Sequence, residues 1–117
     1  MDIESIWAYC SAKPHTEESF PFNSETLVLK VGNKIFTLFS IESFSGLNLK
    51  CDPERSIELR ENYSGVIPAF HMNKKHWNTV KIDEDVDDKL MYELIDHSYS
   101  LVYNSLSKKI RDGFEAR

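Results

Sequence analysis

The sequence predicts an α+β domain in which helices flank an antiparallel sheet of about five strands. Three observations predict it. Apolar residues recur with helical spacing near both ends of the chain, runs between them alternate apolar and polar residues, and Asp52-Pro53 is a typical helix start. The resulting order is α-β-β-β-α-β-β-α, without the β-α-β unit of a parallel sheet. We expect the whole chain, residues 1–117, to form one domain.

The first half of the chain contains a helix and three strands. An apolar stripe predicts an amphipathic helix over 3–13, which Pro14 ends. Residues 15–25 are rich in turn formers and predict an ordered loop. Gly32-Asn33 can form a tight hairpin turn between two alternating runs. Strands are therefore expected at 25–31, 34–41 and 47–51.

The second half begins with a helix that Asp52 caps and that runs to about Asn62. The longest helix opens at Asp87 or Asp88 and runs to about Leu106, and the charged tail that follows is expected to fray. Its core stripe comprises Leu90, Met91, Leu94, Ile95, Ser98, Leu101, Val102 and Ser105, and a flanking row comprises Tyr92, Asp96, Tyr99 and Tyr103. Between the two helices we expect an extended segment at 67–72, a turn at 73–75 and a strand at 76–82.

Composition narrows the class of protein. Cys10 and Cys51 match no metal or redox spacing and are expected to be buried free thiols in a reducing compartment. The chain has no basic N-terminal segment with a long apolar run, and no stretch long enough for a membrane span. We therefore expect a cytoplasmic protein that does not bind membranes.

Charge is distributed unevenly along the chain. The net charge is −5, yet residues 26–51 carry +2 and residues 62–82 carry +3, which leaves −10 for the remainder. Acidic residues gather in the predicted helices and loops, and lysines gather in the predicted strands. This segregation favours a basic face on an acidic protein. The alternative is that the lysines protect the edges of the sheet from aggregation.

No motif predicts an enzyme or a cofactor. Asp96-His97-Ser98 contains the residue types of a catalytic triad, but adjacent helical residues point about 100° apart and cannot converge. His71 and His76 have no neighbouring carboxylate or thiolate, and the two lysines between them repel a cation. We expect no catalytic residue, no metal site and no cofactor.

The most informative run is VIPAFHMNKKHWNTV at 66–80, which contains no carboxylate. Its lysines are candidates for phosphate contacts, although they could simply be solvated at a hairpin tip. Asn73, His76 and Asn78 are candidates for hydrogen bonds to backbone or bases. Trp77 is either a base-stacking residue or part of the core.

This run, extended to GVIPAFHMNKKHWNTV and followed by LIDHSYSLV, resembles the MmcQ/YjbR family of small bacterial proteins. Supporting stretches are FPF at 20–22, LVLKVGNKIFTL at 27–38 and LKCDPERSIELRENY at 49–63. The resemblance implies a secretion-chaperone-like or CyaY-like fold and a DNA-binding function without a catalytic residue. The family motif falls on His71, Asn73, Lys74, Lys75, His76, Trp77 and Asn78.

Two functions follow as expectations. The first is a non-enzymatic DNA-binding protein with modest, salt-sensitive affinity. The second is a protein-interaction or chaperone-like module that acts as a homodimer or on a peptide through its sheet or last helix, because tyrosines are enriched at interfaces. An enzyme is a distant third. The phosphate contacts expected for DNA are Lys74 and Lys75, aided by Lys30, Lys34, Lys50 or Lys81.

Overall fold

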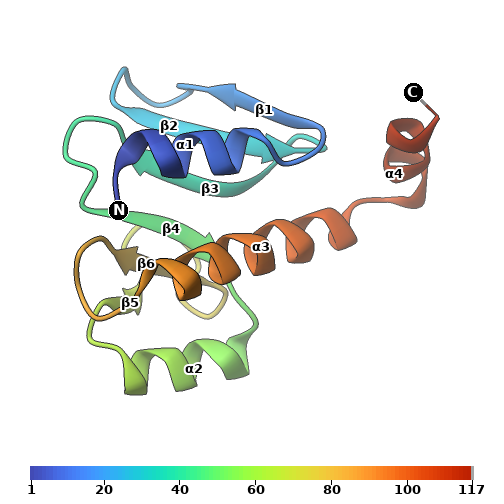
Figure 1. The fold of residues 1–117 in the computed structure, drawn as a ribbon. Helices are drawn as coiled ribbons and strands as arrows, with labels where there is room; N and C mark the ends of the chain where they lie inside the picture. Colours follow the sequence, from blue (N-terminus) through green and yellow to red (C-terminus); the bar gives the residue numbers. More distant parts are fainter. Residues whose placement is uncertain (117) are drawn as a thin grey trace.

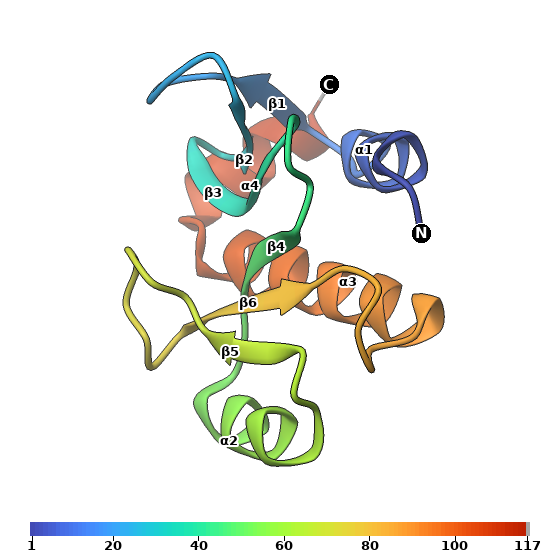
Figure 2. The same cartoon turned by 90° about the vertical axis from the view of Figure 1, so that its left-hand side faces the viewer.

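In the computed structural model, which describes residues 1–116, one antiparallel sheet is flanked by helices (Figures 1 and 2). Its strands lie in the order β1-β2-β3-β4-β6-β5. The α+β class predicted from the sequence is confirmed. The elements are α1 (Ile3–Ser11), β1 (Thr16–Ser19), β2 (Thr26–Val31), β3 (Lys34–Ser40), β4 (Gly46–Lys50), α2 (Pro53–Asn62), β5 (Val66–Pro68), β6 (Trp77–Lys81), α3 (Asp88–Ser105) and α4 (Lys108–Glu115).

The turn between β2 and β3 has the geometry that its residues predict. Gly32 and Asn33 have φ angles of 56° and 66°, so both lie in the left-handed region that a type I′ turn requires. A side chain at position 32 would also collide with Leu106, since an added Cβ would lie 2.6 Å from Leu106 Cδ1. Glycine at this position therefore lets the hairpin pack against the end of α3.

The helices begin where the sequence places their caps. The Asp52 carboxylate accepts hydrogen bonds from the N–H groups of Glu54 and Arg55 at 2.9 and 3.3 Å. Asp87 accepts one from the N–H of Leu90 at 2.8 Å. These bonds satisfy N–H groups that have no partner within the helix. The predicted starts of α2 and α3 are confirmed.

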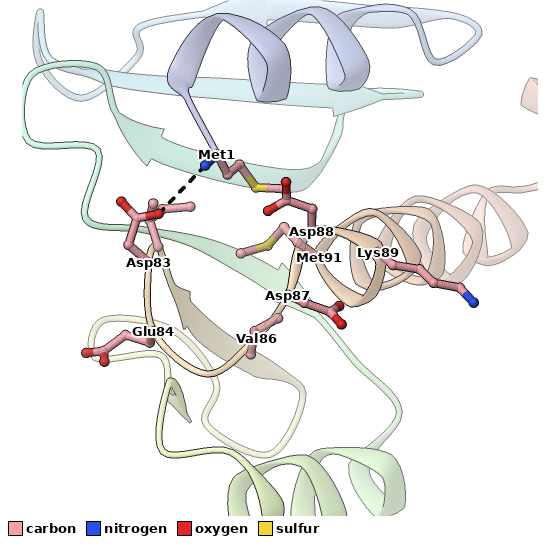
Figure 3. Close-up of a pocket in the computed structure, with 9 residues that line it drawn as sticks. Met1, Asp83, Glu84, Val86, Asp87, Asp88, Lys89 and Met91 are labelled. Carbon is pink, nitrogen blue, oxygen red and sulfur yellow. Dashed lines mark ion pairs between the residues drawn. The ribbon is translucent and has the colours of Figure 1, made fainter.

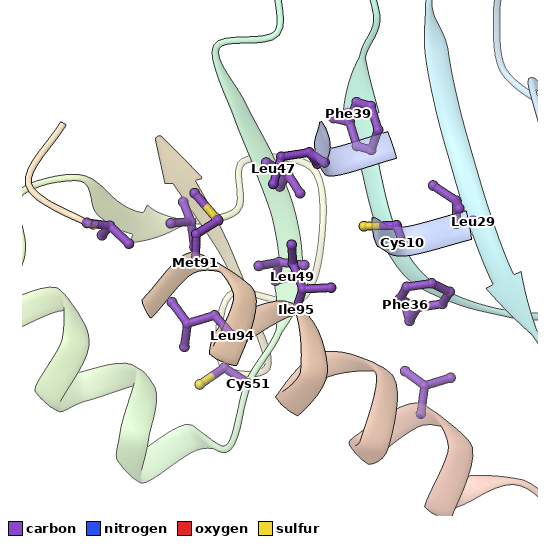
Figure 4. Close-up of a cluster of buried hydrophobic side chains, with 14 of the residues drawn as sticks. Cys10, Leu29, Phe36, Phe39, Leu47, Leu49, Cys51, Met91, Leu94 and Ile95 are labelled. Atoms are coloured by element: carbon purple, nitrogen blue, oxygen red, sulfur yellow. The ribbon is translucent and has the colours of Figure 1, made fainter. Parts of the chain in front are cut away.

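The core lies between one face of the sheet and the helices α1 and α3 (Figure 4). Cys10 and Cys51 are buried free thiols there, as predicted. Burial raises the pKa of Cys10 to about 12 and also raises the pKa of Cys51. Strand residues in this core include Leu29, Phe36, Phe39, Leu47 and Leu49, and helix residues include Met91, Leu94 and Ile95.

Two elements differ from the sequence prediction. The segment expected to be a loop contains β1, which pairs with β2 from Thr16 opposite Val31 to Ser19 opposite Val28. The tail expected to fray forms α4. There the ring of Phe114 stacks on His15 at 4.3 Å between centroids, and the contact ties the C-terminal helix to the turn after α1. Both elements gain their stability from pairing or packing with distant residues.

The tyrosine row of α3 makes contacts inside the molecule. The Tyr99 hydroxyl donates to the carbonyl oxygen of Pro14 at 2.6 Å. The Tyr9 hydroxyl donates to Asp96 at 2.6 Å, and the Tyr9 ring lies 4.4 Å from that of Tyr92. The row therefore packs α3 against α1 and the turn that follows α1.

Candidate nucleic-acid interface

The second face of the sheet carries no helix, and we call it the open face. In Figure 2, α1 and α3 lie to the right of the strands, while the loops around residues 20–25 and 69–76 project to the left. Alternation along β4 and β6 turns one set of side chains to the core and the next to the open face. The pairs Asn48–Thr79 and Lys50–Trp77 are directly opposite each other on the open face.

The larger of two adjoining hollows among the described residues lies on this face and has a volume of about 550 Å³. Phe22 and Phe70 stand at it, one from each projecting loop, and their side chains are 67% and 77% exposed. Two neighbouring aromatic rings with this exposure are unusual on a surface that binds no partner. We call this larger hollow the Phe22–Phe70 hollow. Its other lining residues are Asn23, Thr26, Ile35, Leu38, Asn48, His71, Met72 and Thr79.

The smaller hollow, the Lys34–Trp77 hollow, has a volume of about 340 Å³. Ile35 and Met72 line both hollows, so the two adjoin. Trp77 is half-buried, and its pairing with Lys50 and the alternation along β6 place it on the open face. The remaining lining residues are Lys50 and, from α3, Val102 and Ser105, so this hollow lies at the end of the strands, where the open face meets the C-terminal end of α3.

Arg60 of α2 holds the loop at 69–76 in place. Its Nε donates to Asn78 Oδ1 at 2.7 Å, and its Nη2 donates to the carbonyl oxygen of Lys74. Asn78 in turn donates to Ser56 Oγ at 3.1 Å. The Asn73 side chain accepts from the N–H of Lys75 at 2.9 Å and shapes the turn. The basic loop is therefore ordered before any ligand binds.

Four of the predicted lysines gather around the hollows. Lys34 and Lys50 line the smaller one. The Lys74 ammonium lies 5.7 Å from the centre of the Phe70 ring, within cation–π distance, and Lys75 is exposed beside it. In the part of the chain that the structure describes, none of the four forms an ion pair with a carboxylate.

The other two predicted lysines lie apart. Lys30 of β2 lies opposite Glu17 of β1, so a carboxylate neighbours it across the strands. Lys81 lies four residues beyond Trp77 at the far end of β6, roughly 13 Å away along the strand. The lysines do not all share one patch, and the positive charge is concentrated at the end of the face that Trp77 occupies.

Negative charge is concentrated elsewhere. No described carboxylate lines either hollow of the open face. A third hollow, of about 480 Å³, lies at the start of α3 and is lined by Asp83, Glu84, Asp87 and Asp88 (Figure 3). The amino group of Met1 lies 3.7 Å from Asp83 there. The surface thus separates an acidic region from the lysines of the open face.

Comparison with known proteins identifies the family. The family model described as YjbR matches residues 11–101. The chain belongs to the YjbR family. It is 35% identical over 112 residues to YjbR of Escherichia coli strain K12, with 95% of each chain covered. It is 39% identical over 97 residues to YbdF of Escherichia coli O157:H7, covering 82% of this chain and 80% of that protein.

Solved structures share the fold. The crystal structure of Deinococcus radiodurans protein DR2400, a DUF419 domain, has a TM-score of 0.90 at 38% identity, with 97% of this chain and 87% of that chain covered. A crystal structure of a Pseudomonas syringae protein has a TM-score of 0.74 at 26% identity, with 87% and 99% covered. The six-stranded arrangement is therefore that of other proteins similar in sequence.

The residues of the YjbR motif that were predicted to contact nucleic acid lie in different environments. Asn78 is 2% exposed and its amide is engaged with Arg60 and Ser56, so the nucleic-acid contact predicted for it is wrong. Asn73 shapes the turn, and the carbonyl of His76 accepts from the N–H of Cys51 at 2.8 Å. His71 is exposed and lines the larger hollow, where it meets the edge of Phe70.

Sequence reasoning missed Phe22, Phe70, Asn48 and Arg60. A signal existed for three of them. Phe22 stands in a turn-rich segment, Phe70 belongs to the carboxylate-free run at 66–80, and the alternation of LNLK puts Asn48 on the same face as Lys50. Arg60 gave no signal, because its role depends on how α2 lies against the loop.

Two further properties concern residues 1–116. No group of three or more His, Cys, Asp or Glu side chains there is arranged to hold a metal ion. None of the helices in this part of the chain has the length and apolar character to span a membrane.

Proposed function

We propose that this YjbR-family protein is a non-enzymatic DNA-binding protein whose interface is the open face of its sheet. One observation carries the proposal. In a chain with a net charge of −5, two lysines and Trp77 line the smaller hollow, two phenylalanines line the larger one, and no described carboxylate lines either. Lysines supply the phosphate contacts on which most DNA affinity depends. A DNA partner implies a cytoplasmic location.

The lysines near the hollows define the expected affinity. Lys34, Lys50, Lys74 and Lys75 can neutralise three or four phosphates, and Trp77 offers a ring for stacking. With that many contacts, affinity should fall on the order of a hundredfold between 50 and 200 mM salt. The affinity should therefore be modest at physiological salt.

The test is fluorescence anisotropy with a labelled oligonucleotide at these two salt concentrations. A Lys74→Ala/Lys75→Ala variant should bind about tenfold more weakly and lose about two units of the logarithmic salt slope. Lys108→Ala/Lys109→Ala removes an adjacent lysine pair from α4 and serves as the matched control. Salt-independent binding, or equal binding by both double variants, would contradict the proposal.

A protein-interaction module is the second candidate, favoured by the exposed rings of Phe22 and Phe70. Its other support, the tyrosine row of α3, is weakened because those rings pack within the chain. A pull-down from lysate with and without nuclease separates the two functions. Partners that survive nuclease favour this candidate, and partners lost on nuclease treatment favour DNA binding.

A further inference from the structure

We infer that the Phe22–Phe70 hollow receives one unstacked base of a single DNA strand, presenting a carbonyl oxygen to Asn48. This inference rests on the proposed function and specifies its ligand. It assigns the base to the larger hollow and the neighbouring phosphate to Lys34 and Lys50 in the adjoining hollow.

The shape of the larger hollow suits a flat ring. Its volume of about 550 Å³ lies within the usual range for small-ligand pockets. Its lining includes the aliphatic side chains of Ile35 and Leu38 and two phenylalanines from separate loops. Aromatic side chains at such positions stack on bases regardless of base identity, because every base has a π-face.

The polar groups of the hollow predict a preference for bases that carry a carbonyl oxygen. The Thr79 hydroxyl donates to Asn48 Oδ1 at 2.6 Å, which occupies the amide oxygen and orients the NH₂ group. That NH₂ group has the Met72 sulfur at 3.6 Å as its acceptor, and a thioether is a weak acceptor. A carbonyl oxygen on a base is a far better hydrogen-bond acceptor than this sulfur. Thymine, cytosine and guanine carry such an oxygen, and adenine does not.

The lysines of the adjoining hollow predict where the backbone of the DNA strand lies. Lys34, Lys50 and the Trp77 ring occupy the hollow that adjoins through Ile35 and Met72. A strand with a base in the larger hollow would therefore meet two ammonium groups next to it. In a duplex the bases are stacked inside the helix and cannot enter a protein hollow without being extruded. The site should therefore favour a single strand over a duplex.

The experiment compares four ligands by anisotropy or competition. These are a thymine-rich single strand, its duplex, a strand of equal length with abasic positions, and thymidine monophosphate. The single strand should bind about tenfold more tightly than the duplex or the abasic strand, as expected for one or two stacked bases. The mononucleotide, with one phosphate, should bind far more weakly.

Variants then test the hollow itself. Phe70→Ala and Phe22→Ala should each weaken single-strand binding at least about fivefold and leave duplex binding unchanged. Ile57→Ala is the matched control, since Ile57 is a 57% exposed apolar side chain on α2. Asn48→Leu should reduce the preference of the protein for thymine-rich over adenine-rich strands.

Photocrosslinking gives a readout that does not depend on affinity. A strand carrying 5-bromodeoxyuridine should crosslink to residues 22 or 70–72, and crosslinks confined to other segments would overturn the inference. Duplex binding that depends on Lys74 but is unaffected by either phenylalanine variant would also overturn it, while leaving the proposed function standing. Absence of DNA binding in every form would overturn both. Mononucleotide binding as tight as that of the strand would overturn the assignment to a strand.

Discussion

The two faces of the sheet are built from the same strands and differ in almost every physical property. In β4, Leu47 and Leu49 are buried against the helices, while the alternate residues Asn48 and Lys50 line the hollows. Several polar groups on the covered face have partners within the chain. Ser98, for example, donates to the carbonyl oxygen of Phe36 at 2.6 Å and accepts from the N–H of Lys50 at 2.8 Å. On the open face, by contrast, Phe22 and Phe70 are exposed, and Lys50 forms no ion pair within residues 1–116.

This difference predicts that stability and the proposed DNA binding can be separated by mutation. Neighbouring residues of one strand should have opposite phenotypes, because successive side chains of a strand point to opposite faces. Substitutions on the covered face should change the free energy of unfolding, and substitutions on the open face should change the affinity for DNA.

Leu49→Ala should have the largest effect on stability. Leu49 is 2% exposed and packs in the core, so its truncation leaves a cavity. The free energy of unfolding should fall by about 3 kcal/mol, measured by urea denaturation. The DNA affinity of the folded variant should be unchanged. A variant with normal stability and lost binding would break the separation of the two faces.

Ser98→Ala should have the next largest effect. The buried hydroxyl links α3 to both β3 and β4, and its removal leaves the Phe36 carbonyl and the Lys50 N–H without that partner. A loss of about 1–3 kcal/mol is expected from thermal or urea unfolding. Ser100 lies two residues further along α3 and is exposed. Ser100→Ala is therefore the control and should leave the free energy of unfolding unchanged.

A smaller effect should appear as a pH dependence of stability. His97 Nε2 accepts a hydrogen bond from the N–H of Asp52 at 3.1 Å, which requires a neutral ring. Burial, with a contribution from Arg55, lowers the pKa of His97 below its ordinary value of 6.5. The unfolded chain therefore binds the proton more readily than the folded chain.

The sign follows from that difference. The stability contributed by His97 is fully present above pH 6.5 and is lost as the pH falls towards the lower pKa of the folded state. In the His97→Gln variant, the urea midpoint should change less between pH 7.5 and pH 5.5 than it does in the unmodified protein. An unchanged slope in this variant would assign the pH dependence to other groups.

Lys50→Ala should have the smallest effect on stability, within about 0.5 kcal/mol, because the side chain lies on the open face. Its affinity for DNA should nevertheless fall several-fold, since one phosphate contact is lost. Compared with Leu49→Ala, this variant is the sharpest test of the two-face comparison. Reduced stability with unchanged affinity would refute it.

Most of the fold could be predicted from local patterns. Asp52 and Asp87 cap helices, Gly32-Asn33 forms the predicted turn, and alternation locates the central strands. β1 could not be predicted because its sequence, TEES, has no apolar alternation and becomes a strand only by pairing with β2. α4 could not be predicted because it depends on the stacking of Phe114 against His15.

The site was less predictable than the fold. The basic run was recognised, but Asn78 is turned inward because its position in β6 places it opposite Leu49 on the covered face. The run at 66–80 supplies only one side of the larger hollow. The other side comes from Phe22, which is distant in sequence and adjacent only through the sheet order. Single-residue patterns carry no information about such contacts.

The two outer strands have a consequence for behaviour at high protein concentration. β1 has four residues, including Glu17 and Glu18, and β5 has three and ends in Pro68, which lacks an N–H group. Short, charged or proline-containing borders recruit further strands poorly, so sheets of neighbouring molecules should not join into fibrils. The protein can therefore display two phenylalanines to solvent without amyloid-like growth.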